Sequence, residues 1–162
     1  MAFRKIIVMG VSGSGKSLIA DQLATALKCL YIDADDFHTP DNIRKMASGT
    51  PLNDDDRESW LSDLVNLLAR EEAIVLACSA LKARYRDRLR SADSSVQFLY
   101  LKGDIDVIWP RLVQRQHHYF AGKGMLLSQF AQLEEPTEGE ATVIDIDQPP
   151  QAVFQQCLDS LR

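Results

Sequence analysis

The chain lacks several features that mark specialised classes of protein. In a sequence of 162 residues, no apolar run approaches the length of roughly 20 residues that a membrane span requires. The N-terminal residues show no apolar segment of signal-peptide length. Only three cysteines occur, Cys29, Cys78 and Cys157, and they form no CxxC pair or zinc-type spacing. We therefore expect reduced, buried cysteines in a cytoplasmic protein with no membrane partner.

Basic residues are also scarce, with 18 Lys and Arg against 23 Asp and Glu. The formal net charge of −5 argues against a general nucleic-acid binder, which needs a surplus of cations to meet phosphates. A local basic pocket stays compatible with this balance. The length and the absence of repeats or a long linker predict one domain spanning residues 1–162.

Short apolar runs alternate with helical patterns along the whole chain. The runs are continuous, as in strands that are covered on both faces. They predict strands at 5–9, 29–33, 73–78, 96–101 and 141–146. Helical spacing predicts helices at 18–27, 41–47, 82–91, 104–115 and 149–161. A further helix is expected to begin at a cap formed by Asn53 or Asp54. This alternation predicts an α/β fold with a parallel sheet between two helical layers. Residues 115–129 are the least regular, and they predict either a surface loop or a mobile lid.

One glycine-rich stretch follows the first predicted strand and opens the first predicted helix. It reads Gly10-Val11-Ser12-Gly13-Ser14-Gly15-Lys16-Ser17 and matches G-x-x-x-x-G-K-[ST] at every fixed position. Glycines let successive backbone N–H groups wrap an anion, and the helix N-terminus adds partial positive charge. Lys16 would reach the β- and γ-phosphates, and Ser17 would ligate Mg²⁺. The alternative is a plain turn, but the spacing favours ATP binding by a kinase, a motor or a switch.

Acidic residues follow the second predicted strand, in Asp33-Ala34-Asp35-Asp36-Phe37-His38. The carboxyl ends of parallel strands share one edge of the sheet, so Asp33 and Asp35 should face the phosphate loop. In an extended D-x-D both acids point to the same side, which would place one near a metal and one near an acceptor hydroxyl. The alternative is a solvated acidic turn. Asp36 is interpreted as structural, and His38 either contacts a polyhydroxy substrate or closes the turn.

The third predicted strand ends without an acid, in Cys78-Ser79-Ala80-Leu81-Lys82. Many phosphate-loop motors and switches place a metal-binding aspartate at this point, so its absence weakens both of those interpretations. Arg57 follows three aspartates that suit the start of a helix. Its planar guanidinium matches a carboxylate with two parallel hydrogen bonds, which indicates an anionic acceptor.

The combination of "GVSGSGKS", "DADDFH", "KMASGTPLNDDDR", "CSALK", "FLYLKGD" and "VIDIDQP" resembles the gluconokinase family. That family is related to shikimate kinase within the phosphate-loop kinases, and the resemblance runs from about residue 5 to the C-terminus. It implies ATP-dependent phosphorylation of D-gluconate at the 6-hydroxyl. It also implies a five-stranded parallel sheet in the order 2-3-1-4-5, and a homodimer.

The resemblance also implies roles for individual residues. Asp35 would orient the acceptor hydroxyl and take its proton, while Asp33 and Ser17 would serve Mg²⁺. Arg57 is the first choice for the gluconate carboxylate, and the alternatives and the candidate hydroxyl contacts are Arg44, Lys82, Arg86, His38 and Ser79.

A second group of residues is assigned by analogy with related kinases. Arg115 would lie over the transferring phosphoryl group and Arg111 near the adenine, although both would also fit an exposed helix face. Asp147 and Gln148 would border the adenine, and closure of 116–124 would exclude water. Pro110 lies within the same predicted helix as Arg111 and is expected to kink it.

Two rival functions stay open at this point. The fold could serve a kinase for another small acid such as shikimate, or for a nucleotide, because acceptor choice depends on few side chains. The chain could instead be a nucleotide-binding regulator without acceptor chemistry. The D-x-D beside the phosphate loop favours a kinase, since a pure binder does not need it.

Overall fold

The computed structural model describes residues 4–114 and 122–161 of the chain. Its centre is one sheet of five parallel strands in the order β2-β3-β1-β4-β5. The strands are β1 (Arg4–Met9), β2 (Leu30–Asp33), β3 (Ala73–Ala77), β4 (Gln97–Lys102) and β5 (Thr142–Asp145). Both the strand positions and the sheet order agree with the expectations from the sequence.

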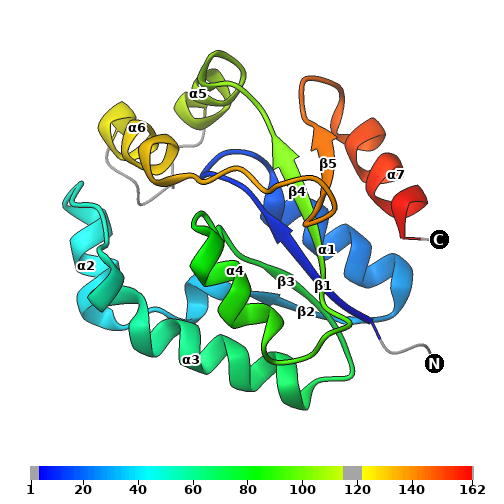
Figure 1. The fold of residues 1–162 in the computed structure, drawn as a ribbon. Coiled ribbons are helices and arrows are strands. Elements are labelled where there is room, and N and C mark those ends of the chain that lie inside the picture. Colours follow the sequence, from blue (N-terminus) through cyan, green and yellow to red (C-terminus); the bar gives the residue numbers. More distant parts are fainter. Residues whose placement is uncertain (1–3, 115–121, 162) are drawn as a thin grey trace.

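Helices cover both faces of the sheet, with α1 and α7 on one side and α3 and α4 on the other (Figure 1). The helices are α1 (Lys16–Leu27), α2 (Pro40–Ala47), α3 (Asp54–Arg70), α4 (Ala83–Arg90), α5 (Ile105–Val113), α6 (Gly122–Gln132) and α7 (Pro150–Ser160). Asn53 begins α3 with a capping box, as its position before the acids suggested. Thr39 caps α2, and Pro40 occupies the first turn.

The side chains of β1 show why its apolar run is continuous. Ile6 and Val8 pack into the cluster under α1 and α7, whereas Ile7 and Met9 pack into the cluster under α3 and α4. Successive side chains of a strand point to opposite faces, and helices cover both faces of this sheet, so all four side chains are fully buried. A strand between two helical layers therefore has no polar side.

Two local elements differ from the expectations. Residues 122–132 form α6, although 115–129 lacked a regular pattern in the sequence. The helix places Met125, Leu126 and Gln129 on one buried face, and this short i, i+1, i+4 pattern follows two glycines that disfavour helix. The second difference is a 3-10 turn, η1 (Ala34–Phe37), where we expected an extended D-x-D. Asp33 caps this turn, and its side chain accepts a hydrogen bond from the Asp35 N–H at 3.0 Å.

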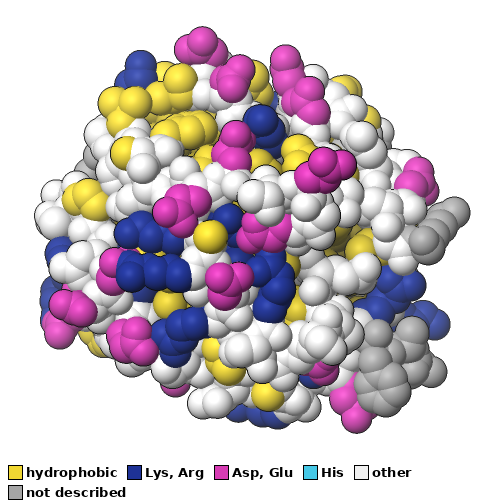
Figure 2. All heavy atoms as spheres, viewed as in Figure 1, with side chains coloured by type: hydrophobic (Ala, Val, Ile, Leu, Met, Phe, Trp, Pro, Cys, Tyr) yellow, Lys and Arg dark blue, Asp and Glu magenta, His cyan; other side chains and the backbone are white. Residues whose placement is uncertain are grey.

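The surface and the cysteines agree with the composition. Figure 2 shows basic and acidic side chains mixed on the face that carries α3 and α4. Cys78 and Cys157 are buried, Cys29 is half-buried, and all three are free thiols. Within residues 4–114 and 122–161, no helix combines the length and apolar character that crossing a bilayer requires.

Candidate active site

The phosphate loop joins β1 to α1 and depends on glycines for its shape. Gly13 and Gly15 adopt positive φ angles of 82° and 93°, a region that other residues rarely occupy. A Cβ on Gly13 would also lie 2.6 Å from a side-chain carbon of Leu112 on α5. The Gly13 position thus combines a left-handed backbone with a close approach to a neighbouring helix.

A cavity of about 450 Å³ opens beside this loop, between α1, α5 and the start of α7. Its lining comprises Gly13, Ser14, Gly15, Leu18, Ile19, Arg111, Gln114, Ile146, Pro150 and Val153. The Arg111 guanidinium is held at the edge by a 2.8 Å hydrogen bond to the Ile146 carbonyl. A mostly apolar slot that begins at a phosphate-binding loop suits a flat, largely apolar ring such as a purine.

The loop after β5 borders this cavity, but through residues other than those expected. Ile146 and Pro150 line it, whereas Asp147 and Gln148 do not. Asp147 lies in a separate hollow next to β5, and Gln148 donates hydrogen bonds to the Asp145 carbonyl and the Gln156 side chain. The prediction favoured the polar residues of "DIDQPP", whereas the cavity is lined by the apolar Ile146 and Pro150 of that stretch.

Asp33 and Ser17 meet at the end of the phosphate loop. The Ser17 hydroxyl donates a 2.9 Å hydrogen bond to Asp33 Oδ2, while Asp33 Oδ1 caps η1. The caps and bonds of Asp33 therefore hold Asp35 and the first residues of α1 in one arrangement. Asp33, the last residue of β2, thus contacts the phosphate-loop end as predicted, whereas Asp35 lies in η1 and not in an extended D-x-D.

A second cavity lies across the phosphate loop from the first and brings together five of the expected site residues, Lys16, Asp35, His38, Arg57 and Ser79. The remaining walls are Met46, Pro51, Leu52, Leu81, Met125, Ser128, Gln129 and Gln132. The residues of α6 among these were not predicted as site residues, because α6 itself was not expected.

His38 is a buried wall of this cavity and is held on three sides. Its ring stacks on the Trp60 ring at 4.4 Å between centroids, and its Nδ1 lies 3.4 Å from the Asn42 side-chain amide nitrogen. Burial is the main cause that lowers the pKa of His38, although Asp35 opposes the shift. With Nδ1 accepting from Asn42, the neutral ring carries its proton on Nε2, which lies 3.8 Å from Asp35 Oδ1.

Arg57 presents a buried cation to the same cavity. The residue is 8% exposed, and its guanidinium donates a 3.2 Å hydrogen bond to the Tyr85 hydroxyl. The guanidinium also lies over the Tyr85 ring, 5.5 Å from its centroid. No carboxylate within the described part of the chain forms an ion pair with it. A buried guanidinium without a counter-ion favours an anionic ligand, because desolvated charge is costly unless it is paired.

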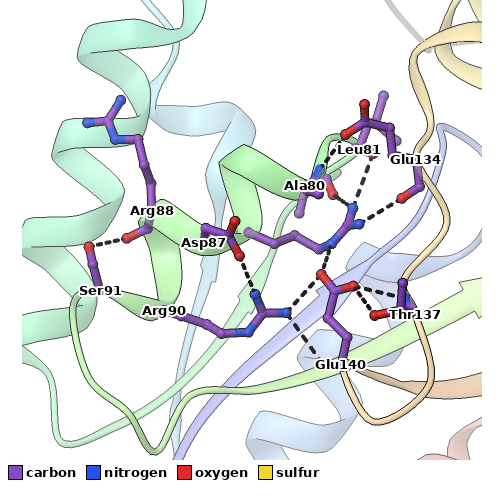
Figure 3. Close-up of polar contacts among 11 residues, drawn as sticks. Ala80, Leu81, Asp87, Arg88, Arg90, Ser91, Glu134, Thr137 and Glu140 are labelled. Atoms are coloured by element: carbon purple, nitrogen blue, oxygen red, sulfur yellow. Dashed lines mark hydrogen bonds and ion pairs between the residues drawn. The ribbon is translucent and has the colours of Figure 1, made fainter.

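The other basic candidates lie outside the cavity lining. Arg44 is exposed and forms an ion pair with Asp41, and Lys82 forms an ion pair with Asp54 at 3.1 Å. Arg86 is fully buried and has a structural role instead. It donates to the carbonyls of Ala80, Leu81 and Glu134 and pairs with Glu140 at 2.7 Å (Figure 3). The carboxylate role considered for Arg86 is therefore wrong, since Arg86 is absent from the cavity lining and all three of its guanidinium nitrogens already donate to protein oxygens.

Some expectations fall on residues outside the described ranges. Arg115 and most of the segment 116–124 belong there, while residues 122–124 begin α6. Pro110 lies inside α5, as expected. Arg111 follows it and lines the first cavity, the one between α1, α5 and the start of α7.

The oxygen atoms near Lys16 suit a hard divalent cation. Within residues 4–114 and 122–161, no group of three or more His, Cys, Asp or Glu side chains could hold a metal by itself. Mg²⁺ does not need such a group, because it keeps several waters and binds through one or two protein oxygens and substrate phosphates. The Ser17–Asp33 pair provides oxygens of this kind.

Comparisons with known proteins agree with this geometry. The shikimate kinase family model matches residues 12–162. The thermoresistant gluconokinase of Escherichia coli (strain K12) is 44% identical, over 96% of this chain and 92% of that protein. A crystal structure of a gluconokinase from Sinorhizobium meliloti 1021 is 40% identical with a TM-score of 0.91, over 99% of this chain and 93% of that one. Shikimate kinase from Aquifex aeolicus vf5 shares only the fold, with 15% identity and a TM-score of 0.61 over 97% and 95% of the two chains. The chain therefore belongs to the shikimate kinase family and, within it, to the gluconokinases.

Proposed function

We propose that this protein transfers the γ-phosphoryl group of ATP to the 6-hydroxyl of D-gluconate, giving 6-phospho-D-gluconate and ADP. The observation that carries the proposal is the buried Arg57, which forms no ion pair with any of the residues that the structure describes, in one cavity with Lys16 and Asp35. A cation, a phosphate-loop lysine and a carboxylate are what a small anionic alcohol needs for phosphorylation. The names of the relatives support gluconate as that alcohol.

ATP would occupy both sides of the phosphate loop. Its adenine fits the apolar slot that Leu18, Ile146 and Val153 line, with Arg111 at the edge. Its phosphates would lie on the N–H groups of residues 10–17, at the N-terminus of α1. The buried Ser14 hydroxyl has no hydrogen-bond partner within the described residues, and a phosphate oxygen would provide one.

The reaction is an in-line displacement at the γ-phosphorus. The 6-hydroxyl oxygen forms a bond to phosphorus, the bond to the β,γ-bridging oxygen breaks, and ADP leaves with the electron pair. Asp35 orients the hydroxyl and takes its proton, and His38 Nε2–H faces the Asp35 carboxylate from the buried side. Lys16 stabilises negative charge on the transferring group.

Arg57 would bind the gluconate carboxylate at the far end of the cavity. Gluconate is a chain of six carbons, so anchoring its carboxylate leaves the hydroxyl on C6 as the group presented to the phosphate loop. Ser79 and His38 would contact the intervening hydroxyls. Arg44 and Lys82 are less suitable for this role, because each already pairs with an aspartate outside the cavity.

Mg²⁺ would bind near Ser17 and Asp33. When bound, it neutralises part of the charge on the β- and γ-phosphates. The Ser17 hydroxyl would be a direct ligand, and Asp33 would hold a coordinated water. The hydrogen bond between the two side chains already places their oxygens 2.9 Å apart.

The proposal also covers the residues before α6, the assembly of the enzyme and its partners. Arg115 would stabilise the transferring phosphoryl group, and 116–124 would exclude water from it. We infer that residues 1–162 act as one domain, that the enzyme is a cytoplasmic homodimer, and that it has no nucleic-acid or membrane partner. The acidic composition supports the absence of a nucleic-acid partner, and the absence of a long apolar run supports the absence of a membrane partner.

A coupled assay of ADP release tests the proposed function. The acceptors are D-gluconate, shikimate, other sugar acids and nucleoside monophosphates, each with ATP and Mg²⁺. We expect kcat/KM to be highest for gluconate by at least tenfold. Equal or faster turnover of another acceptor would contradict gluconate as the substrate. ADP release that does not depend on any acceptor would indicate an ATPase or a regulator instead.

A further inference from the structure

A buried hydrogen bond joins α6 to the phosphate loop. The Gln129 side-chain carbonyl accepts a hydrogen bond from the Ser12 backbone N–H at 2.6 Å, across 117 residues of sequence. Gln129 is 8% exposed and Ser12 is 3% exposed. Water has little access to such a site. Removing the Gln129 carbonyl would therefore leave the buried Ser12 N–H without this acceptor, which costs free energy.

The same helix forms one wall of the second cavity, which contains Lys16, Asp35 and Arg57 and is called the acceptor cavity from here on. Met125, Ser128 and Gln132 line this cavity with Gln129, together with Lys16 and Asp35. The Gln132 side-chain carbonyl is buried and has no hydrogen-bond partner within the described residues. A hydroxyl of a bound polyol would supply the missing donor. α6 thus contacts the phosphate loop with one glutamine and faces the acceptor cavity with another.

The C-terminal end of α6 is fixed to the opposite side of the cavity. The Glu134 N–H donates to the Leu81 carbonyl at 2.8 Å, and the Glu134 side chain accepts from the Ala83 N–H at 2.8 Å. Arg86 holds the Glu134 carbonyl at 2.7 Å, and Figure 3 shows Glu134 beside Ala80 and Leu81. Toward the other end, Leu126 packs into the core and the Gln129 side chain supplies the hydrogen bond to the phosphate loop.

We propose that Gln129 is a positioning residue that couples acceptor binding to nucleotide binding. An acceptor that contacts α6 from inside the cavity holds the helix against the loop, and the helix holds the Ser12 backbone in the conformation that receives ATP. By thermodynamic linkage, each substrate then tightens the other by the same factor. This inference rests on the proposed function, because it takes gluconate as the acceptor.

Calorimetric titration tests the coupling. The dissociation constant of gluconate is measured with and without a saturating, non-hydrolysable ATP analogue and Mg²⁺. The dissociation constant of the analogue is then measured with and without saturating gluconate. We expect the wild-type protein to bind gluconate at least about fivefold more tightly with the analogue present, as is typical of coupled sites. Gln129→Met keeps the length and helix propensity of the side chain but removes the acceptor, and we expect its factor to fall below about twofold.

Gln155→Ala on α7 is the matched control, because Gln155 is exposed and bonds only to Asp159 on its own helix among the contacts described. It should keep the wild-type factor. A wild-type factor near one, or an unchanged factor in Gln129→Met, would overturn the coupling. Failure of gluconate to bind at all, with another acceptor binding instead, would contradict the proposed function and is a separate outcome.

Hydrogen exchange of the Ser12 amide, followed by NMR without ligands, gives an independent readout. We expect slow exchange in the wild type and at least tenfold faster exchange in Gln129→Met, with the amides of β1 unchanged. Unchanged β1 amides would show that the variant is folded. Equal Ser12 exchange in both proteins would contradict the role of Gln129 in holding the loop.

Discussion

Arg57 gains its importance from what surrounds it. The guanidinium is buried and contacts the hydroxyl and the ring of Tyr85, and neither group carries a negative charge to balance it. The Tyr85 hydroxyl in turn donates to Asp54, which also pairs with Lys82 and Arg84. A carboxylate that enters the cavity would therefore meet a guanidinium that is oriented in advance and needs no reorganisation.

The first prediction concerns the removal of this cation. Arg57→Ala should raise KM for gluconate by roughly 10- to 100-fold, since a hydrogen bond to a charged group contributes about 1.5–3 kcal/mol. KM for ATP should change by less than about twofold. Steady-state kinetics with each substrate varied in turn gives both values. Arg70→Ala is the control, because Arg70 is an exposed residue at the end of α3. Equal effects on the two KM values would remove Arg57 from the acceptor site.

The second prediction concerns Asp35. Asp35→Asn keeps the size of the side chain but cannot take a proton, so kcat should fall by roughly 10²- to 10⁴-fold. The dissociation constant of ATP should stay within about twofold, because Asp35 lies in the acceptor cavity and not in the nucleotide slot. The neighbouring Asp36→Asn, on the exposed side of η1, should keep nearly full activity. A full-rate Asp35→Asn enzyme would show that this acid does not take part in the reaction.

At the scale of elements, the segment after α6 is anchored to α4 by a charged network. Burial alone would raise the pKa of Glu140, but hydrogen bonds from Arg86, the Thr137 N–H and Arg90 outweigh it and lower this pKa to about 2. A carboxyl whose pKa is lower in the folded state stabilises the fold above its unfolded pKa. That contribution is complete above about pH 4.5 and is lost as the pH falls toward 2.

The third prediction follows from that network. Glu140→Gln should lower the free energy of unfolding at pH 7 by about 3 kcal/mol, because Arg86 loses its buried counter-ion. Urea unfolding at pH 7 and at pH 3 measures the difference, which should be smaller at pH 3. Asp87→Asn removes an exposed partner of Arg90 and should cost less than about 1 kcal/mol. A Glu140→Gln penalty that is independent of pH would contradict the ionic origin of the effect.

The elements also show what the sequence could predict. Five strands and six of the seven α-helices follow from apolar runs, helical spacing and caps such as Asn53, which are local signals. Helix α6 was missed because its buried face is short and its first residues include two glycines. The role of Arg86 was missed because its partners Glu134 and Glu140 lie about 50 residues away, and only the folded chain brings them together.

For the molecule as a whole, the parallel sheet explains why the site could be located from the sequence. Strand ends on one edge of the sheet bring the phosphate loop, Asp33 and Ser79 together, whatever the lengths of the intervening helices. The walls of the acceptor cavity could not be predicted in the same way. They come from α2, α3 and α6, whose positions depend on packing between distant segments.

The fourth prediction concerns assembly. Light scattering at micromolar concentration should give a mass of twice the 18.2 kDa of one chain, since a homodimer is proposed. The mass should be unchanged by gluconate and ATP, because neither cavity is proposed to need a second copy. A mass of one chain at all concentrations would contradict the dimer and leave the catalytic proposal intact.

The most direct measurement is the identity of the product. After complete reaction of D-gluconate with ATP and Mg²⁺, phosphorus NMR should show ADP and one phosphate ester in equal amounts. The ester resonance should couple to two protons, as a phosphate on the primary C6 alcohol does. A Lys16→Ala protein should give neither. An ester that couples to one proton, or inorganic phosphate and ADP without an ester, would contradict the central claim that Asp35 presents the 6-hydroxyl of gluconate to the phosphate loop.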